Sequence, residues 1–102
     1  ATPLVIAAAE GHNDMAMLLL AHGAAVDAAM NIGATSLFAA AADGHKDMAT
    51  LLLAHGAAVD AATNIGATSL FAAASRGHKD MATLLLAHGA AVDAATNSGA
   101  TP

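Results

Sequence analysis

Histidine is the residue type in this sequence best suited to chemistry, and six histidines recur at regular spacing. They form two rows in which successive members are 33 residues apart: His12, His45 and His78, and His22, His55 and His88. Imidazole rings serve proteins as general bases and as metal ligands. The first question is therefore whether the elements that carry these rings can bring several of them to one point.

If the segments that carry the histidines form stacked helices, neither row can place its histidines around one metal ion. His12 and His22 bracket a predicted helix and are ten residues apart, which is roughly 15 Å along a helix axis. Equivalent histidines of stacked helices are separated by the helix packing distance, about 8–10 Å. A zinc ion needs several ligands about 2 Å away. We therefore expect structural roles for the histidines and no metal site within the chain, with a metal ion bridging two molecules as the alternative.

Nucleophilic and phosphate chemistry are not predicted either. Ser36, Thr50 and Ser69 have no histidine and carboxylate at the spacing that a hydrolytic triad requires. The glycines are scattered as single turn signals and form no phosphate-binding loop. The absence of cysteine excludes disulfides, thiolate metal ligands and a cysteine nucleophile. We predict a protein that is not an enzyme, with no catalytic residue and no cofactor.

Charge and hydropathy exclude two further classes of partner. The net charge is −5, and three basic residues offer little to a phosphate backbone or an anionic lipid surface, so we predict neither nucleic-acid nor membrane binding. The longest apolar run, Met15 to Ala21, is far shorter than the roughly 18–20 residues that a helix needs to span a bilayer. The charge is graded along the chain: residues 1–33 carry −3, residues 34–66 carry −2, and residues 67–99 carry 0.

A 33-residue repeat explains the spacing of the histidines. The units are residues 1–33, 34–66 and 67–99, and residues 100–102 match the start of a fourth. We therefore predict one repeat array over residues 1–102. We expect this array to stop in mid-pattern rather than at a polar cap. Units two and three differ at only three pairs of positions: Ala42/Ser75, Asp43/Arg76 and Ile65/Ser98.

Each unit predicts two helices and an extended connection. In the second unit Thr35 is a good N-cap for a short apolar helix over about Ser36–Ala42. Apolar residues at helical spacing predict a second helix over about Lys46–His55, and Gly56 suits a left-handed C-terminal position. Residues 57–66 are expected to form an extended connection with a turn. One helix pair cannot bury its apolar face alone, so the units must stack.

The repeat carries a familiar set of short motifs. In the first unit these are Thr2-Pro3-Leu4, Ala7-Ala8, Gly11-His12, Leu19-Leu20, Gly23-Ala24 and Val26-Asp27-Ala28. With these motifs and this period, the unit resembles the ankyrin repeat over the whole chain. The resemblance implies an all-α solenoid of stacked helix-turn-helix units joined by β-hairpin loops. It also implies a non-enzymatic scaffold for protein–protein interaction, with a protein partner that the sequence does not identify.

One departure from the family concerns the contacts between repeats. The family usually has a histidine after Thr-Pro-Leu that forms hydrogen bonds between repeats. Val5, Phe38 and Phe71 occupy that position here. We therefore expect packing by phenylalanine to replace the usual polar contacts.

The resemblance also indicates where a partner binds. In the family, partners dock on the hairpin tips and on the exposed ends of the first helices, on the concave face. The matching residues are Glu10, Asn31, Ile32, Ala34, Asp43, Asn64, Ile65, Ala67, Ser75, Arg76, Asn97 and Ser98. The differences between units two and three all fall within this region, which fits either selection for a partner or the tolerance of exposed positions. With one arginine and no tryptophan or tyrosine, the chain is expected to make a weak or shallow contact.

A second hypothesis comes from the ends of the array. Solenoids need polar caps because each terminal unit otherwise exposes an apolar stacking face. The two end faces are complementary by construction, so the alternative function is a structural repeat segment that self-associates head to tail.

Overall fold

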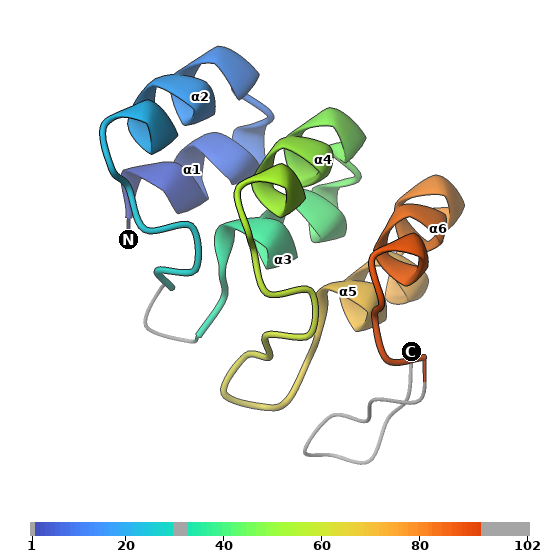
Figure 1. Ribbon diagram of the computed structural model, residues 1–102. Coiled ribbons are helices and arrows are strands. Elements are labelled where there is room, and N and C mark those ends of the chain that lie inside the picture. The colour runs from blue at the N-terminus through green and yellow to red at the C-terminus, as the bar shows by residue number, and fades with distance from the viewer. Residues whose placement is uncertain (1, 30–32, 93–102) are drawn as a thin grey trace.

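Six helices make up the regular structure of the residues that the computed structural model describes, which are 2–29 and 33–92. In chain order (Figure 1) they are α1 (Pro3–Glu10), α2 (Asn13–Ala21), α3 (Ser36–Asp43), α4 (Lys46–Ala54), α5 (Ser69–Ser75) and α6 (Lys79–Ala87). Each repeat contributes one helix pair. No helix in the described part of the chain is long and apolar enough to cross a membrane.

The first helix of each repeat begins at a threonine cap. The Thr35 hydroxyl accepts a hydrogen bond from the backbone N–H of Phe38 at 3.2 Å, and the equivalent threonines of the other repeats make the same bond. Pro3 is the first residue of α1, where the helix needs no N–H donor. Gly44 ends α3 in the left-handed region, at φ 75°. The predicted cap and first helix are confirmed, with α3 one residue longer than expected.

The second helices end one residue earlier than the sequence predicted, and the predicted glycine follows their C-cap residue. α4 stops at Ala54, and His55 is its C-cap residue rather than its last helical residue. Gly56 follows with φ 89°. Its N–H donates to the carbonyl of Leu53, and the N–H of Ala57 donates to that of Leu52, both at 3.0 Å. These two bonds satisfy carbonyls that the end of a helix leaves unpaired.

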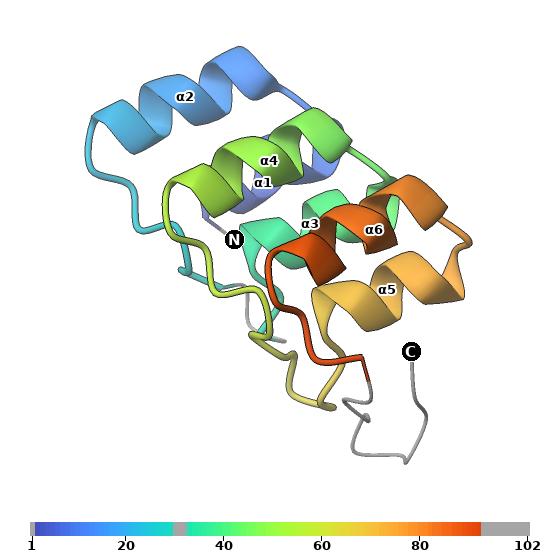
Figure 2. The same ribbon diagram turned by 45° about the vertical axis from the view of Figure 1, so that its right-hand side comes forward.

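The helix pairs stack in two layers, with α1, α3 and α5 in one and α2, α4 and α6 in the other (Figures 1 and 2). The first helices of neighbouring repeats approach more closely than the second helices do. Alanine allows this approach, since Ala8 and Ala41 are completely buried. Larger side chains, such as Met48 and Leu52, fill the space between the second helices. The array therefore curves, and the layer of first helices lies on its concave side.

The connection between the second and third repeats is a tight turn. The N–H of Thr63 donates to the carbonyl of Ala67 at 2.9 Å, and the N–H of Ala67 donates to the Thr63 hydroxyl at 3.2 Å. Gly66 adopts φ 82°, and its N–H donates to the carbonyl of Thr63. Residues 33–92 and 2–29 contain no β-strand, so the expected β-hairpin loop is present there only as this turn.

Candidate functional site

The Gly-His row of histidines joins neighbouring repeats. Nε2 of His45 donates a hydrogen bond to the carbonyl of Ala9 at 3.0 Å, and Nε2 of His78 donates to that of Ala42 at 3.1 Å. Because a carbonyl oxygen only accepts, each ring carries a proton on Nε2. The rings are half-buried and lie above the left-handed glycine of the preceding repeat. These histidines have the structural role that the sequence predicted, and they connect repeats as well as helices.

The remaining histidines are exposed. Nε2 of His12 lies 3.2 Å from Oε1 of Glu10 in the same repeat. His22, His55 and His88 are exposed C-cap residues of the second helices. Among the described residues no group of three or more histidine, aspartate or glutamate side chains could hold a metal ion.

Two aspartates in the connecting segments also join the repeats. Oδ1 of Asp27 accepts a hydrogen bond from the N–H of Ala58, and Oδ1 of Asp60 accepts one from the N–H of Ala91, both at 3.0 Å. In each case the carboxylate satisfies a backbone donor just after the second helix of the next repeat. Hydrogen bonds to a charged acceptor are stronger than bonds between neutral groups. The aspartates and the Gly-His histidines therefore clamp each junction from both ends of the helix pair.

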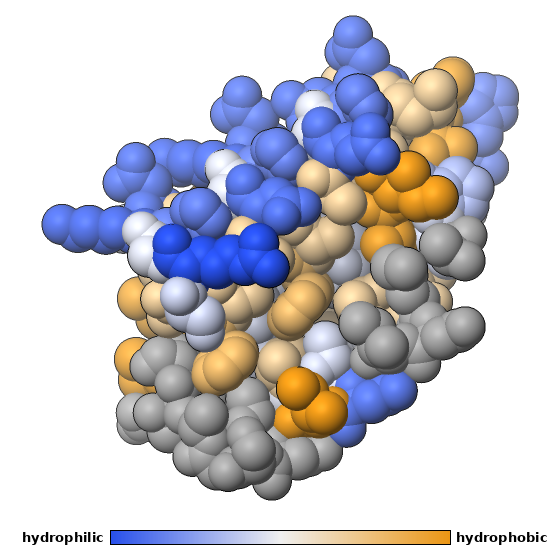
Figure 3. All heavy atoms as spheres, turned by 180° about the vertical axis from the view of Figure 1, so that it is seen from behind, coloured by the Kyte–Doolittle hydropathy of each residue, from blue (hydrophilic) through white to orange (hydrophobic). Residues whose placement is uncertain are grey.

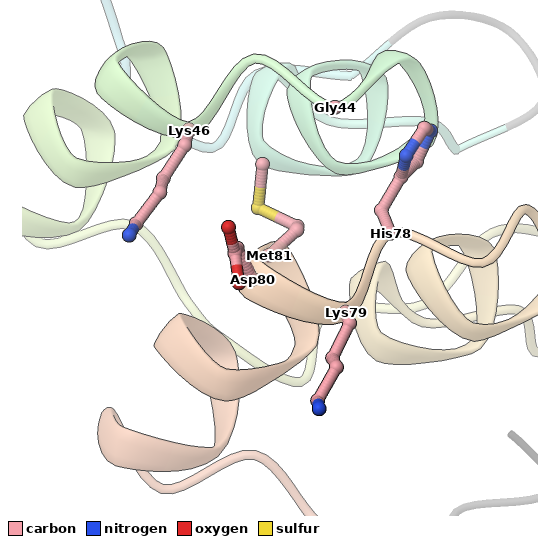
Figure 4. Close-up of a pocket in the computed structure, with 6 residues that line it drawn as sticks. All are labelled: Gly44, Lys46, His78, Lys79, Asp80 and Met81. Carbon is pink, nitrogen blue, oxygen red and sulfur yellow. The ribbon is translucent and has the colours of Figure 1, made fainter.

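A hollow of about 320 Å³ beside this junction offers no reactive arrangement. His78 lies over Gly44 at its edge, where the ring already donates to a backbone carbonyl (Figure 4). The side chains of Lys46 and Lys79 extend in similar directions but lie well apart, with Asp80 between them (Figure 4). Among the described residues Asp80 forms no ion pair with either lysine. A catalytic site needs a nucleophile or acid and base within hydrogen-bond reach of one reacting group. This hollow has no such convergence.

The ends of the first helices carry a row of exposed charged side chains. Glu10, Asp43 and Arg76 occupy equivalent positions in successive repeats, and all three are exposed. Nη1 of Arg76 lies 3.5 Å from Oδ1 of Asp43. Ser75 is exposed beside Arg76. The structure thus brings together four of the predicted site residues as one polar edge.

The turn of the second repeat carries an apolar pocket. Ile65 is 63% exposed at the tip of the turn. With Phe38, Thr63, Asn64 and Ala67 it lines a cavity of about 250 Å³, which is large enough for one apolar side chain. Phe38 comes from the start of α3, so the pocket lies at the opposite end of the first helix from the charged row. An eight-residue helix separates them by about 12 Å.

The polar edge and the pocket are both built on the first helices and on the turn that leads into one of them. Figure 3 shows the molecule from behind, with hydrophilic side chains mainly at the top and left and hydrophobic ones at the right and lower down. We refer to Glu10, Asp43, Ser75, Arg76, Asn64, Ile65 and Phe38 as the concave surface.

Two predicted site residues are nearly buried instead of exposed. Ala34 is 5% exposed and Ala67 is 4% exposed, although Ala67 still lines the pocket beside Ile65. The reason is their place directly before the threonine cap, where the chain turns inward to begin the first helix. Four other predicted residues, Asn31, Ile32, Asn97 and Ser98, lie outside the described residues.

The hydrogen bonds that the polar residues at the junctions make between repeats were not predicted from the sequence. Their signal was present, because Asp27 and His12 recur unchanged in every repeat at the same position. Residues that connect one repeat to the next must recur in this way. Phe38 and Phe71 are half-buried, and the contacts between repeats are not left to packing alone, because histidines elsewhere supply polar bonds.

Comparison with known families agrees with this architecture. A family model described as ankyrin repeats (3 copies) matches residues 1–63, and one described as ankyrin repeat matches residues 65–97. A search among curated proteins finds no significant match.

Proposed function

We propose, since the chain belongs to the ankyrin repeat family, that it binds a protein partner through its concave surface. Members of this family are generally protein–protein interaction modules and are typically not enzymes. The observation that supports this surface is the apolar pocket under Ile65, set about 12 Å from the charged row of Glu10, Asp43 and Arg76. The partner's identity is left to experiment.

The chemistry of the concave surface defines the kind of partner segment that fits it. A cavity of about 250 Å³ accepts one apolar side chain such as leucine. The polar edge presents two carboxylates and one guanidinium, which pair with side chains of both signs. Few residues of the types that dominate binding energy are present, so the contact is expected to have a Kd of about 1 μM or weaker.

Alanine substitution tests the proposed surface. Partners are first selected from a displayed protein library against the intact chain, and binding is then measured with Ile65→Ala and Arg76→Ala. Truncating an exposed anchor at an interface typically weakens binding by about 1–2 kcal/mol, or roughly tenfold. Thr83→Ala is the control, because Thr83 is exposed on α6, away from the first helices. Equal binding by all three variants would show that the partner docks elsewhere.

A second candidate function, head-to-tail self-association, is favoured by the exposed end faces. Met15 is 49% exposed and Leu18 is 52% exposed in the first repeat, whereas Met48, the equivalent of Met15, is completely buried against the preceding repeat. At the other end Leu86 is 45% exposed. Light scattering over a wide range of concentration tests this function, because association increases the mean mass and a monomer keeps it constant.

A further inference from the structure

We infer that the partner binds the concave surface as an extended segment with two anchors. One is an apolar side chain in the pocket beside Ile65, and the other, about four residues away, is an arginine or lysine that lies between Glu10 and Asp43. The inference rests on the first proposed function, binding of a protein partner, and names the chemistry of the bound segment. Asp43 and Ile65 belong to the second repeat and are exposed although another repeat packs on each side of it.

The pocket accepts an aliphatic side chain and offers little to a polar one. Ile65 is largely exposed and Phe38 is half-buried, so both present apolar surface to the cavity of about 250 Å³. The hydroxyl of Thr63 accepts from the N–H of Ala67, and the N–H of Thr63 donates to the Ala67 carbonyl, so both groups are engaged within the turn. A leucine in this cavity gains the free energy of leaving water, whereas a charged side chain would lose its hydration without finding a partner.

The exposed face of α3 leads from the pocket to the charged row. Phe38 lies near the start of this helix and Asp43 is its last residue. Between them the same face carries Ala39 and Ala42, which are half-buried and too small to block the approach of another backbone. The partner's main chain can therefore follow α3 closely from one anchor to the other.

The length of α3 sets the spacing of the two anchors. Eight residues of helix measure about 12 Å, and an extended chain covers that distance in about four residues. Side chains alternate along an extended chain, so two residues that are four apart point to the same side. A helical partner would need about eight residues for the same distance, and ordering the longer segment would cost more conformational entropy.

The second anchor point lies where the charges of neighbouring repeats meet. Glu10, Asp43 and Arg76 occupy equivalent positions in successive repeats. Nη1 of Arg76 lies 3.5 Å from Oδ1 of Asp43, so side chains at these positions reach across a junction. On its other side Asp43 faces the repeat that carries Glu10, and among the described residues Glu10 forms no ion pair with lysine or arginine. An arginine of the partner placed there would contact two carboxylates as Arg76 contacts one.

Several observations favour a basic segment over an acidic one. Helices α1 and α3 both end at this edge, and the negative ends of their dipoles attract cations. Glu10 contacts the imidazole of His12 at 3.2 Å, a group that the net charge of −5 counts as neutral at pH 7. Arg76 is already paired with Asp43, so an acidic segment would have to compete with that carboxylate. The negative net charge also attracts a basic segment over longer distances.

Synthetic peptides test the two anchors and their spacing. The first is a nonapeptide with leucine at its third position, arginine at its seventh, and glycine or serine elsewhere. A second carries glutamate instead of arginine, and a third has the arginine at its sixth position, which turns the two side chains to opposite sides of an extended chain. Each peptide is made in both sequence orders, because α3 does not determine the direction of the partner chain. NMR titration of the isotope-labelled protein measures binding.

The first peptide is expected to bind in one of its two orders with a Kd of about 0.1–1 mM, as a short flexible segment should. The glutamate peptide and the peptide with the displaced arginine are expected to bind about fivefold more weakly at low salt.

Charge reversal on the protein provides the matched test. Asp43→Lys is expected to weaken binding of the arginine peptide about fivefold and to strengthen binding of the glutamate peptide. Asp47→Lys makes the same change in net charge, from −5 to −3, but Asp47 is exposed on α4 in the layer of second helices, so this variant is expected to bind both peptides nearly as the original chain does. Ile65→Ala is expected to weaken both peptides alike. Circular dichroism verifies that each variant keeps its helix content.

The outcomes distinguish the bound segment from the proposed function. Equal binding of the arginine and glutamate peptides, equal effects of Asp43→Lys and Asp47→Lys, or no binding of the first peptide in either order at millimolar concentration would each overturn the inference. In these cases the proposed function stands if library-selected partners still lose affinity with Ile65→Ala. If those partners are indifferent to both Ile65→Ala and Arg76→Ala, the proposed function is wrong and the inference is wrong with it.

Discussion

The first and second repeats have nearly the same sequence but differ in their surroundings. Met15 is half exposed, whereas Met48 at the equivalent position is completely buried. His12 lies against an exposed carboxylate, whereas His45 donates to a backbone carbonyl of the neighbouring repeat. The difference comes from the presence of a preceding repeat. In this molecule the role of a residue is set by its neighbour in the stack more than by its own helix.

The largest expected effect is the difference in the free energy of unfolding between alanine variants of Met48 and Met15. Met48→Ala leaves a cavity between α2 and α4 and is expected to lower the free energy of unfolding by about 2–5 kcal/mol. Met15→Ala removes a half-exposed side chain and is expected to lower it by less than about 1 kcal/mol. Chemical denaturation followed by circular dichroism measures both variants. Similar losses would mean that the end face of the first repeat is packed as tightly as an internal junction.

The next largest expected difference in stability is between alanine substitutions at two left-handed glycines, Gly44 in the second repeat and Gly77 in the third. Alanine at Gly44 is strained by the positive φ, and its methyl group would also press on the ring of His78. We expect Gly44→Ala to destabilise the chain by about 2–3 kcal/mol and Gly77→Ala, which meets no described neighbour, by about 1–2 kcal/mol. The two variants are compared by their denaturation midpoints, provided that the free energy of unfolding falls with denaturant concentration at the same slope in both. The reverse order would show that the histidine ring does not rest on Gly44.

The histidines themselves provide a third test. His45→Ala removes the hydrogen bond to Ala9 and leaves that carbonyl without its partner, so we expect a loss of about 1–2 kcal/mol in the free energy of unfolding. His12→Ala and His55→Ala, both at exposed positions, are expected to have no measurable effect when the chain is monomeric. If His55→Ala were as costly as His45→Ala, the division of the histidines into connecting and exposed rows would be incorrect.

The smallest expected effect on stability comes from a substitution that gives the second repeat the proline found at the same position in the first. Ser36 is completely buried, and its hydroxyl has no hydrogen-bond partner among the described residues. It is the first residue of α3, where the first repeat has Pro3, and Thr35 before it has the extended backbone that proline requires. Ser36→Pro is therefore expected to stabilise the chain by about 0.5–1 kcal/mol, measured as an increase in denaturation midpoint.

A matched substitution sharpens this last prediction. Ser69→Pro introduces proline at the first residue of α5, after the same threonine cap. Both changes restrict the unfolded chain equally, but only the change at Ser36 also removes a buried hydroxyl identified as unpaired. A destabilising Ser36→Pro would show that the backbone at the start of α3 does not accept a proline ring.

The sequence predicts the elements of this fold well because the signals for them are local. Thr35 and Gly56 mark helix ends through the chemistry of their own turns, and both positions are confirmed. The 33-residue period indicates stacking without any knowledge of the junctions. The protein family follows from the same short motifs.

The candidate site is less predictable because it depends on how repeats superimpose. The carbonyl that His45 reaches is set by the rise and rotation from one repeat to the next, which residue types do not reveal. Ala34 and Ala67 illustrate another limit, since alanine is compatible with an exposed turn and with a buried helix start. Charged side chains such as Asp43 and Arg76 were placed correctly on the surface because burial of an unpaired charge is costly.

The hydrogen bonds between repeats have a consequence for how the chain folds. In the described residues the side-chain bonds that cross a junction join positions 31 to 36 apart in sequence. Adding another repeat to the array would therefore create further loops of this length but none longer. Since the entropy of loop closure and the rate of folding depend on the sequence separation of contacts, the barrier to adding one repeat should be the same in a short array as in a long one.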